Sequence, residues 1–303
     1  MTLVRETPLD YSPKFSEETG AQVWFKLENL QHTGSFKLRG AVNRLMTLTN
    51  EQRDAGCVAA SSGNHGAAVA YAMGHLGVNG VIFVPEQTSP TKVDAIRSYG
   101  GDVRFFGTDG LDTELHARKY AEQNKMFYLS PYNDEEVMAG QGSCGVEIAT
   151  QLPDIDAAFV AIGGGGLISG VGSVLRQHNK NVRIIGCQPS ASAVMTHSVA
   201  AGEILDLPSE PTLSDGTAGG IEAGSITFDV CREIVDEFVL VDEDEIAAAM
   251  RLYMDSEHQL IEGAAGVAIA AMLAKKAELA DCKVVILVCG ANIGRETLRS
   301  VIS

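Results

Sequence analysis

Basic residues are scarce in this chain of 303 residues. Lysine and arginine number 23 against 39 aspartates and glutamates, which gives a formal net charge of −16 at pH 7. This excess of negative charge argues against a polyanionic partner such as nucleic acid and against an anionic membrane surface. No basic run interleaved with aromatic residues offsets it. We therefore predict a small-molecule substrate, with no nucleic-acid or membrane partner.

Patterns that bind metals or form disulfides are also missing. The six cysteines have no CxxC spacing and no nearby histidine partner, which argues against a structural zinc site and a disulfide framework. The segment Met1–Pro8 has no charged leader followed by an apolar core, so we expect a reducing, cytoplasmic location. One uncharged stretch, residues 157–174, imitates a membrane span, but its four consecutive glycines favour a buried strand, a loop and a helix start.

Short β-branched runs alternate along the chain with amphipathic helical patterns. This alternation is typical of an α/β fold in which helices cover a mostly parallel sheet. The predicted strands are Val23–Glu28, Cys57–Ala60, Gly80–Val84, Asp102–Phe106, Ala158–Ile162, Val182–Gln188, Phe238–Val241 and Lys283–Val288. The predicted helices are Ser35–Thr47, Asn64–Leu76, Pro90–Tyr99, Leu111–Gln123, Glu136–Gln151, Leu167–Arg176, Glu243–Glu257 and Ala264–Ala280.

Four consecutive carboxylates, Asp242–Glu245, precede the apolar helical stretch Ile246–Met250. Carboxylates are stabilised at the positive end of a helix dipole, so this run predicts a helix start. The functional alternative is an acidic metal cluster. Helix capping already gives a sufficient reason for these residues, and we favour it.

Four consecutive glycines, Gly163–Gly166, follow the apolar run Ala157–Ile162. Glycines let backbone N–H groups converge on an anion, and a helix N-terminus adds a favourable dipole. The spacing fits neither a dinucleotide-binding motif nor a P-loop. A tight turn that binds nothing is the alternative, but four glycines exceed what a turn needs. The run therefore predicts a phosphate site.

Three other features have the residue types that such a site uses. Ser61–Gly66 follows a predicted strand and opens a helix, which suits a carboxylate ligand, although local capping would explain it too. Lys37 lies between Phe36 and Leu38, and an apolar surround favours the neutral amine that a Schiff base needs; an exposed helical lysine is the alternative. Cys289 ends a predicted strand, where α/β folds bind ligands, or is a buried apolar-like residue.

Together these motifs resemble the fold-type II pyridoxal-phosphate enzymes, and most closely their threonine/serine dehydratase and serine racemase branch. The resemblance is carried by Ser35-Phe36-Lys37, Ser61–Gly66, Gly163–Gly166 and Cys289-Gly290-Ala291-Asn292, in the family's order and spacing along essentially the whole chain. It implies a tryptophan synthase β-like α/β fold with two lobes, each a helix-flanked, mostly parallel sheet. We expect a large cofactor-binding domain at residues 1–52 and 134–303, and a small substrate-gripping domain at residues 53–133.

The resemblance also implies a role for each matching residue. Lys37 would hold pyridoxal 5′-phosphate through its amine and later take the Cα proton of the substrate, and Ser62 matches the second acid/base of the branch's racemases. The cofactor would be held by Phe36, Lys37, Asn64, Gly163, Gly164, Gly165, Gly166, Leu167 and Cys289. The substrate carboxylate would be held by Ser61, Ser62, Asn64 and His65. Cys289 would face the pyridine nitrogen, which a thiol cannot protonate as an aspartate would.

One departure from the family concerns a divalent cation. Many relatives bind one through two carboxylates after a strand, and here Gln188 and Val194 stand where those carboxylates would fall. Loss of two anionic ligands weakens Mg²⁺ or Ca²⁺ binding, so we predict no metal at this site.

The implied activity is dehydration and deamination of a β-hydroxy amino acid to a 2-oxo acid and ammonia. Threonine and serine are the default substrates, and 3-hydroxyaspartate is an option if His65 or Arg39 meets a second carboxylate. A serine/aspartate-type amino-acid racemase is the alternative, and a non-catalytic protein that binds pyridoxal phosphate is a third reading. The family resemblance also suggests a homodimer.

Overall fold

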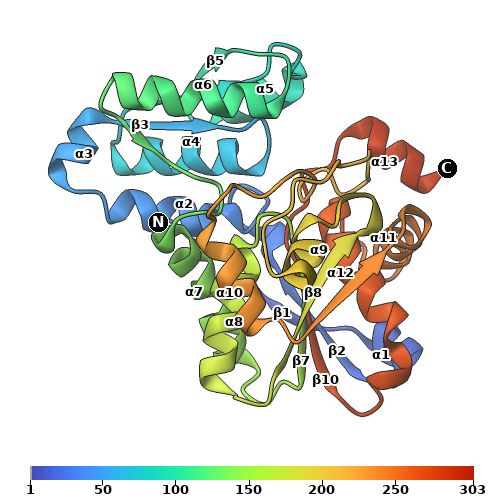
Figure 1. Cartoon of the computed structure of the whole chain (residues 1–303). Helices are drawn as coiled ribbons and strands as arrows, with labels where there is room; N and C mark the ends of the chain where they lie inside the picture. The colour runs from blue at the N-terminus through green and yellow to red at the C-terminus, as the bar shows by residue number, and fades with distance from the viewer. Residues whose placement is uncertain (1) are drawn as a thin grey trace. The chain divides into compact units, whose positions relative to one another are not determined.

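The computed structural model describes residues 2–303, which form two compact units with one sheet each (Figure 1). The smaller unit comprises residues 37–140 together with the described residues before Glu6, and the larger unit comprises residues 6–36 and 141–303. The smaller domain that we predict at residues 53–133 lies within the smaller unit, which also includes residues 37–52 and 134–140, predicted to belong to the large domain. The predicted α/β class, with two mostly parallel, helix-flanked sheets, is confirmed.

The larger sheet has six strands in the order β1-β2-β10-β7-β8-β9. All neighbours are parallel except β1, which pairs antiparallel with β2 at one edge. The central strands are almost wholly buried and rich in valine, isoleucine and alanine, as expected of a parallel sheet covered on both faces. The strands are β1 (Leu9–Tyr11), β2 (Gln22–Leu27), β7 (Ala157–Ala161), β8 (Arg183–Pro189), β9 (Glu237–Val241) and β10 (Lys283–Val288).

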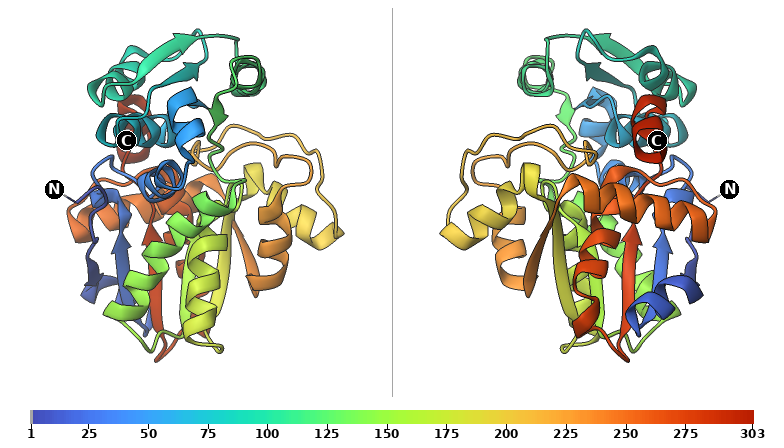
Figure 2. Two further views of the ribbon diagram at one scale, coloured as in Figure 1. Left: turned by 90° about the vertical axis from the view of Figure 1, so that its left-hand side faces the viewer. Right: turned by 90° about the vertical axis from the view of Figure 1, so that its right-hand side faces the viewer.

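Helices cover both faces of the larger sheet, as the two views of Figure 2 show. On one face lie α7 (Glu135–Gln151) and α8 (Gly166–His178), and on the other α11 (Glu243–Glu257) and α12 (Gly263–Ala274). The wholly apolar α12 has ten buried residues, because it packs across strands β7 to β10. The remaining helices of this unit are α1 (Pro13–Thr19), α9 (Val194–Ala201), α10 (Ile226–Ile234) and α13 (Arg295–Ile302), with single 3₁₀ turns at Glu28–Leu30, Ser190–Ser192 and Lys276–Glu278.

The smaller sheet has four parallel strands in the order β5-β4-β3-β6. Alternate residues of its central strands face opposite sides, as the period of two requires. Cys57 and Ile82 belong to one apolar cluster, whereas Val58 and Val81 belong to another that includes residues of α6. The elements of this unit are β3 (Cys57–Ala60), β4 (Gly80–Val84), β5 (Asp102–Phe105), β6 (Phe127–Tyr128), α2 (Lys37–Met46), α3 (Asn50–Ala55), α4 (Asn64–Leu76), α5 (Pro90–Ser98) and α6 (Gly110–Gln123).

Helix α11 begins with side-chain capping bonds, whereas α4 and α8 begin at a glycine without them. At α11 the carboxylate of Asp242 accepts from Glu245 N at 2.9 Å and that of Glu245 accepts from Asp242 N at 2.8 Å, so the predicted acidic helix start is confirmed as a capping box. At α4 and α8 the cap residues are Gly63 and Gly165, and no side chain caps the helix. These two helices therefore present first-turn N–H groups without a side-chain acceptor from the cap residue.

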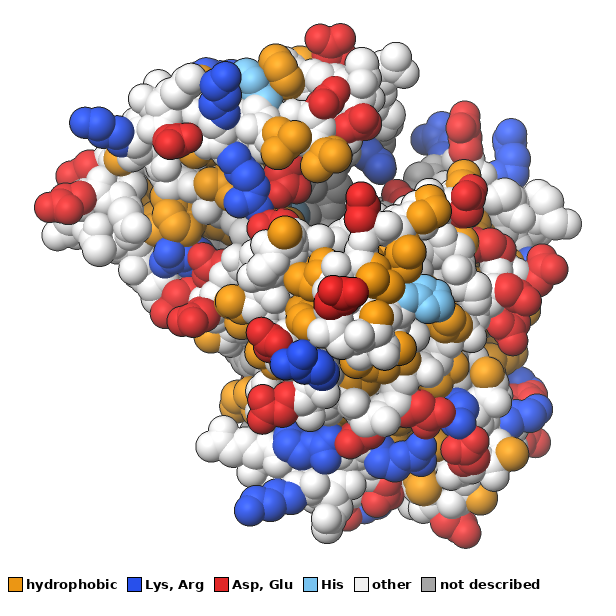
Figure 3. Space-filling view, viewed as in Figure 1, with side chains coloured by type: hydrophobic (Ala, Val, Ile, Leu, Met, Phe, Trp, Pro, Cys, Tyr) orange, Lys and Arg blue, Asp and Glu red, His pale blue; other side chains and the backbone are white. Residues whose placement is uncertain are grey.

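No helix within residues 2–303 combines the length and apolar character that spanning a membrane requires. On the face drawn in Figure 3, lysine and arginine side chains are scattered among aspartates and glutamates. Apolar side chains gather on the same face over α9 and α10.

Candidate functional site

In the larger unit, the predicted cofactor residues follow neighbouring parallel strands. Gly163–Gly166 come after β7 and Cys289 comes after β10, and these strands pair with Val284 opposite Ala157 and Ile286 opposite Phe159. The carboxyl ends of both strands therefore meet at one edge of the sheet, where α/β folds bind ligands.

The glycine loop has the geometry of an anion cradle. Gly165 adopts φ +86°, a left-handed conformation that favours glycine, and serves as the cap of α8. A Cβ added at Gly163 would lie 3.0 Å from the backbone of Thr217, so close packing also requires glycine there. Backbone N–H groups at the start of α8, together with the helix dipole, suit a phosphate group. The residues present therefore fit the phosphate of the predicted cofactor.

Thr217 and Thr227, which are not in the predicted set, both contact the glycine loop. Thr227 Oγ1 donates to the carbonyl of Gly164 at 2.6 Å, and Thr217 packs against Gly163. Ser225 Oγ lies 2.8 Å from Thr227 Oγ1, so the hydroxyl that supports the glycine loop belongs to a buried hydrogen-bonded pair. No local sequence signal marks these residues, because the contact joins positions more than fifty apart.

Phe36 and Cys289 are joined through the backbone. The N–H of Phe36 donates to the carbonyl of Cys289 at 3.0 Å, and Ser35 forms an isolated antiparallel bridge with Gly290. This pairing keeps Ser35 extended, so α2 begins at Lys37 and not at Ser35 as predicted. Leu167, in the first turn of α8, is buried beside the cradle. The larger unit thus brings together Phe36, the glycine loop, Leu167 and Cys289.

A further residue at this edge, Glu262, is absent from the predicted set. It precedes the apolar helix α12, and a carboxylate there reads as an ordinary cap, yet its side chain makes no capping bond. The side chain is buried, and its Oε1 lies 3.8 Å from Cys289 Sγ. The sequence suggests only a helix cap at Glu262 and does not reveal its contact with Cys289.

In the smaller unit, the predicted substrate loop closes tightly after β3. The N–H of Gly63 donates to Ser61 Oγ at 3.1 Å, and a Cβ added at Gly66 would lie 2.2 Å from the carbonyl oxygen of Ser61. Ser61, Ser62 and Asn64 are half-buried, and Asn64 is the first residue of α4. With a glycine as helix cap, the backbone here suits a small anion such as a carboxylate.

Lys37 and His65 both contact the segment that follows β6. Lys37 Nζ donates to the carbonyl of Pro131 at 2.8 Å, and His65 Nε2 lies 3.0 Å from the carbonyl of Leu129. Because a carbonyl only accepts, Nε2 carries the proton and Nδ1 of the neutral ring does not. The smaller unit therefore brings together Lys37 and the Ser61–Gly66 loop, and the peptide bond between Phe36 and Lys37 connects the two residue sets along the chain.

Burial lowers the pKa of His65 to about 3, and the positive charge of Lys37 acts in the same direction; the bond to Leu129 opposes both. The ring is therefore neutral at pH 7 and cannot supply a positive charge to a substrate. Arg39, the other residue considered for a second carboxylate, is buried and donates to the carbonyl of Arg5 at 3.4 Å. A contact between His65 and a substrate carboxylate would have to use its backbone N–H.

The lowered pKa of His65 predicts an acid-labile fold. Between about pH 6.5 and pH 3 the unfolded chain binds a proton at this histidine that the folded chain does not, so stability falls as the pH falls and is fully present above pH 6.5. We expect a loss on the order of 4 kcal/mol across this window. Urea unfolding of wild type and His65→Asn at pH 7 and pH 4 measures it. The variant should lose much of the pH dependence, whereas His178→Asn, at an exposed histidine, should keep it; equal dependence in all three proteins would contradict the assignment.

The family resemblance suggests a cation-binding position at Gln188, and in the structure its side-chain amide is hydrogen-bonded within the protein. Thr196 donates to Gln188 Oε1 through both N, at 2.8 Å, and Oγ1, at 2.7 Å, while Gln188 Nε2 lies 3.5 Å from the carbonyl of Ser192. Val194 is buried at the start of α9. Within residues 2–303 no three His, Cys, Asp or Glu side chains are grouped to hold a metal ion.

The amide of Gln188 therefore predicts that activity is independent of divalent cations. We expect turnover to change by less than about twofold on addition of EDTA or of Mg²⁺, because two neutral side chains replace the anionic ligands that these ions prefer. Steady-state assays after chelation, with and without added Mg²⁺, check this. Activity that EDTA abolishes and Mg²⁺ restores would contradict it.

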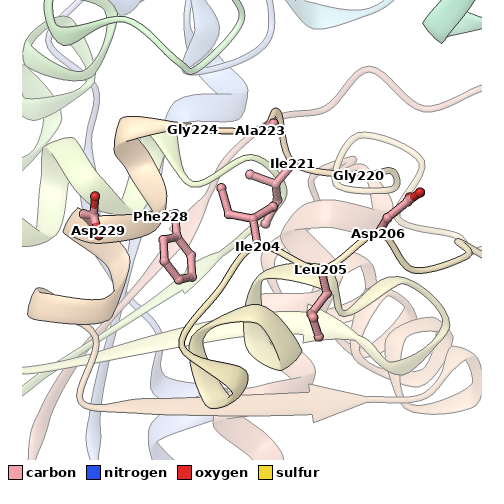
Figure 4. A pocket seen from close by; sticks show the side chains of 9 residues that line it. All are labelled: Ile204, Leu205, Asp206, Gly220, Ile221, Ala223, Gly224, Phe228 and Asp229. Carbon is pink, nitrogen blue, oxygen red and sulfur yellow. The ribbon is translucent and has the colours of Figure 1, made fainter.

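A separate cavity of about 660 Å³ lies on the larger unit (Figure 4). Ile204, Ile221 and Phe228 contribute its apolar wall. None of the predicted site residues lines it, and its carboxylates are Asp206 and Asp229, of which Asp229 is paired with Arg232 at 2.8 Å. None of the residues that line this cavity is a lysine, arginine or histidine.

Comparison with known proteins shows the family of this chain. The profile of the family described as "Pyridoxal-phosphate dependent enzyme" matches residues 1–290. The chain belongs to this family. The predicted family and its cofactor, pyridoxal phosphate, are thereby confirmed.

Individual relatives place the chain in one branch of these pyridoxal-phosphate dependent enzymes. It is 40% identical over 299 residues to an L-threonine ammonia-lyase of Geobacter sulfurreducens, which covers 99% of this chain and 74% of the relative. The structure of the processed form of threonine deaminase isoform 2 from Solanum lycopersicum superposes with a TM-score of 0.95 at 37% identity, over 99% of this chain and 88% of that one. Maize serine racemase superposes with a TM-score of 0.91 at 32% identity, over 99% and 92%.

Proposed function

We propose that this protein is a pyridoxal-phosphate dependent ammonia-lyase that converts a β-hydroxy amino acid to a 2-oxo acid and ammonia. The observation that carries the proposal is the placement of the family's residues. In each unit these residues lie near the carboxyl ends of parallel strands. The smaller unit contains Lys37 and the Ser61–Gly66 loop, and the larger unit contains the Gly163–Gly166 loop and Cys289. Relatives named as threonine ammonia-lyases and threonine deaminases support the same reaction.

Each residue set has a distinct task in this reaction. The start of α8 would hold the cofactor phosphate, with Leu167 beside it, while Phe36 would pack on the cofactor ring and Asn64 would contact its phenolic oxygen. Ser61, Ser62, Asn64 and the backbone of His65 would hold the carboxylate of the substrate. When bound, the cofactor supplies an electron sink for the charge left at Cα.

Lys37 is the proposed general base. Its Nζ would take the Cα proton, after which the β-hydroxyl leaves as water and hydrolysis releases ammonia and the 2-oxo acid. In the structure this amine donates to the carbonyl of Pro131, which gives it a defined resting position. Threonine and serine are the proposed substrates, and 3-hydroxyaspartate is a further one that would require a cation other than His65.

Racemisation is the competing activity, and a specific residue favours it. Ser62 is half-buried in the substrate loop and would be the second acid/base if the protein were a racemase. The similarity to maize serine racemase supports this alternative. A protein that binds the cofactor without turnover is the third reading.

A substrate panel distinguishes these functions. Ammonia and 2-oxo acid would be measured with L- and D-serine, threonine and the 3-hydroxyaspartate isomers, and the chirality of the remaining substrate would be checked. Oxo acid from one member supports the ammonia-lyase. Racemised substrate with little oxo acid would show that the protein is a racemase. If no substrate of the panel changes although the cofactor is bound, the protein binds the cofactor without turnover.

We also propose that the protein is a homodimer, as the family resemblance suggests, and that it is located in the cytoplasm. Sedimentation equilibrium of the cofactor-bound protein tests the oligomeric state. A mass of a single chain at micromolar concentration would contradict it.

A further inference from the structure

The peptide group between Gly164 and Gly165 needs a partner that fixes its orientation. Glycine has no Cβ, so a run of four glycines lets the backbone approach an anion but leaves each peptide group free to rotate. In a trans peptide group, as this one is, the C=O and the following N–H point in opposite directions. The direction of the Gly164 carbonyl therefore decides the direction of the Gly165 N–H.

Thr227, in the first turn of α10, holds this carbonyl. Its Oγ1 donates to the carbonyl oxygen of Gly164 at 2.6 Å, and its side chain is wholly buried. A Cβ added at Gly165 would lie 3.1 Å from Thr227 Cβ, so the same side chain also packs against the next residue. Helix α10 packs against α8, the helix that begins at the glycine loop. Thr227 thus contacts both residues of the peptide group from a helix that is packed in place.

The direction of the hydrogen bonds around Thr227 follows from chemistry. A carbonyl can only accept, so the single hydroxyl proton of Thr227 is used on Gly164. In the 2.8 Å contact between the two hydroxyls, Ser225 Oγ must then be the donor. Ser225 is the cap residue of α10, where a serine side chain usually accepts a backbone N–H, but it makes no capping bond here. Its hydroxyl instead orients that of Thr227.

We propose that Thr227 is a positioning residue for the cofactor phosphate: its hydroxyl, oriented by Ser225, holds the Gly164 carbonyl and so keeps the N–H of Gly165 directed toward the anion. The hydrogen bond at the carbonyl also polarises the peptide group and strengthens its N–H as a donor. Without the hydroxyl the buried carbonyl loses its partner, and a peptide group between two glycines can rotate to find another. The inference rests on the proposed function only in placing the cofactor phosphate at the glycine loop.

Binding of the phosphate group is measured by titrating the cofactor-free protein with pyridoxal 5′-phosphate and with pyridoxal, which lacks the phosphate. Thr227→Val removes the hydroxyl and keeps the shape of the side chain. It should weaken binding of pyridoxal phosphate by about tenfold, the effect of one hydrogen bond, and leave binding of pyridoxal unchanged. Thr227→Ser keeps the hydroxyl and should stay within about threefold of wild type. Ser225→Ala should have a smaller effect than Thr227→Val, because Thr227 can still donate.

Thr19→Val is the matched control. Thr19 is buried in the same unit, and its Oγ1 donates to the carbonyl of Phe15 at 2.8 Å. The variant should lose thermal stability but keep the wild-type affinity for both ligands. Equal weakening of both ligands in Thr227→Val, or weakening of neither, would overturn the positioning role. Wild-type protein that binds pyridoxal as tightly as pyridoxal phosphate would overturn it as well.

Phosphorus NMR of the holoenzyme gives a second readout. The resonance of the bound cofactor should shift in Thr227→Val and keep its wild-type position in Thr19→Val, because only the first substitution changes the donors around the phosphate. An unshifted resonance in Thr227→Val would contradict the proposal. Neither readout needs turnover, so failure of the substrate panel is distinguishable from failure of this inference.

Discussion

Lys37→Ala is expected to abolish turnover and the yellow absorption of the lysine-bound cofactor. We propose Lys37 as the lysine that binds the cofactor, and its amine lies 2.8 Å from the carbonyl of Pro131, which follows β6 of the smaller sheet. Loss of a general acid–base group alone costs about 10²–10⁴-fold in rate. Loss of covalent attachment adds to this cost, so we expect turnover to fall by more than about 1,000-fold. Steady-state assays and absorption spectra of the purified variant measure both effects.

A matched control separates chemistry from a general effect of removing a lysine. Lys180 is exposed, and Lys180→Ala should keep the wild-type rate and spectrum. Lys37→Ala should also bind the cofactor noncovalently, because the glycine cradle is intact. A Lys37→Ala protein that retains both turnover and the yellow absorption would contradict the assignment of the base.

Much of the fold could be predicted from the sequence because its signals are local. The apolar run before Gly163 is a strand, and the four glycines are the turn into a helix, since both depend on neighbouring residues alone. The acidic run at Asp242 caps its helix for the same reason. The motifs that start at Ser61, Gly163 and Cys289 could be placed at strand ends, because each of them closely follows an apolar run.

What the sequence did not show depends on contacts between distant residues. Strands β1 and β6 have three and two residues, too few for a periodic pattern, and they exist because β2 and β3 offer edges to pair with. Thr227 supports Gly164 across 63 positions, and Glu262 reaches Cys289 across 27. Glu262 precedes α12 but makes no side-chain capping bond, and its contact with Cys289 depends on the tertiary structure.

The neutral state of His65 is a further property that could not be predicted from the local sequence. A histidine beside a serine-glycine-asparagine turn suggests a polar ligand, but its protonation depends on burial and on Lys37, 28 positions earlier. The lowered pKa removes His65 as a source of positive charge at pH 7. Substrate selection for a second carboxylate must therefore come from another residue.

Gly165→Ala is expected to weaken cofactor binding by about 100-fold, equivalent to about 2.7 kcal/mol. The left-handed conformation at φ +86° costs a residue with a side chain about 1–2 kcal/mol. A Cβ there would also lie 3.0 Å from Cys231 Sγ and 3.0 Å from Met195 Cε, which adds about 1–3 kcal/mol of overpacking. The loop can relieve both only by shifting the N–H groups at the start of α8. Titration of the cofactor-free variant with pyridoxal phosphate measures the affinity.

The matched control for this substitution is Gly202→Ala. Gly202 has nearly the same backbone conformation, φ +79°, at the end of α9, but no atom lies within 4 Å of an added Cβ. It should lose about 1–2 kcal/mol of stability through strain alone and keep the wild-type affinity for the cofactor. If the two variants bind pyridoxal phosphate equally well, the glycine loop does not hold the phosphate. If only Gly165→Ala loses affinity, backbone strain cannot be the cause, because both variants carry it, and the position of the N–H groups at α8 is what binds the anion.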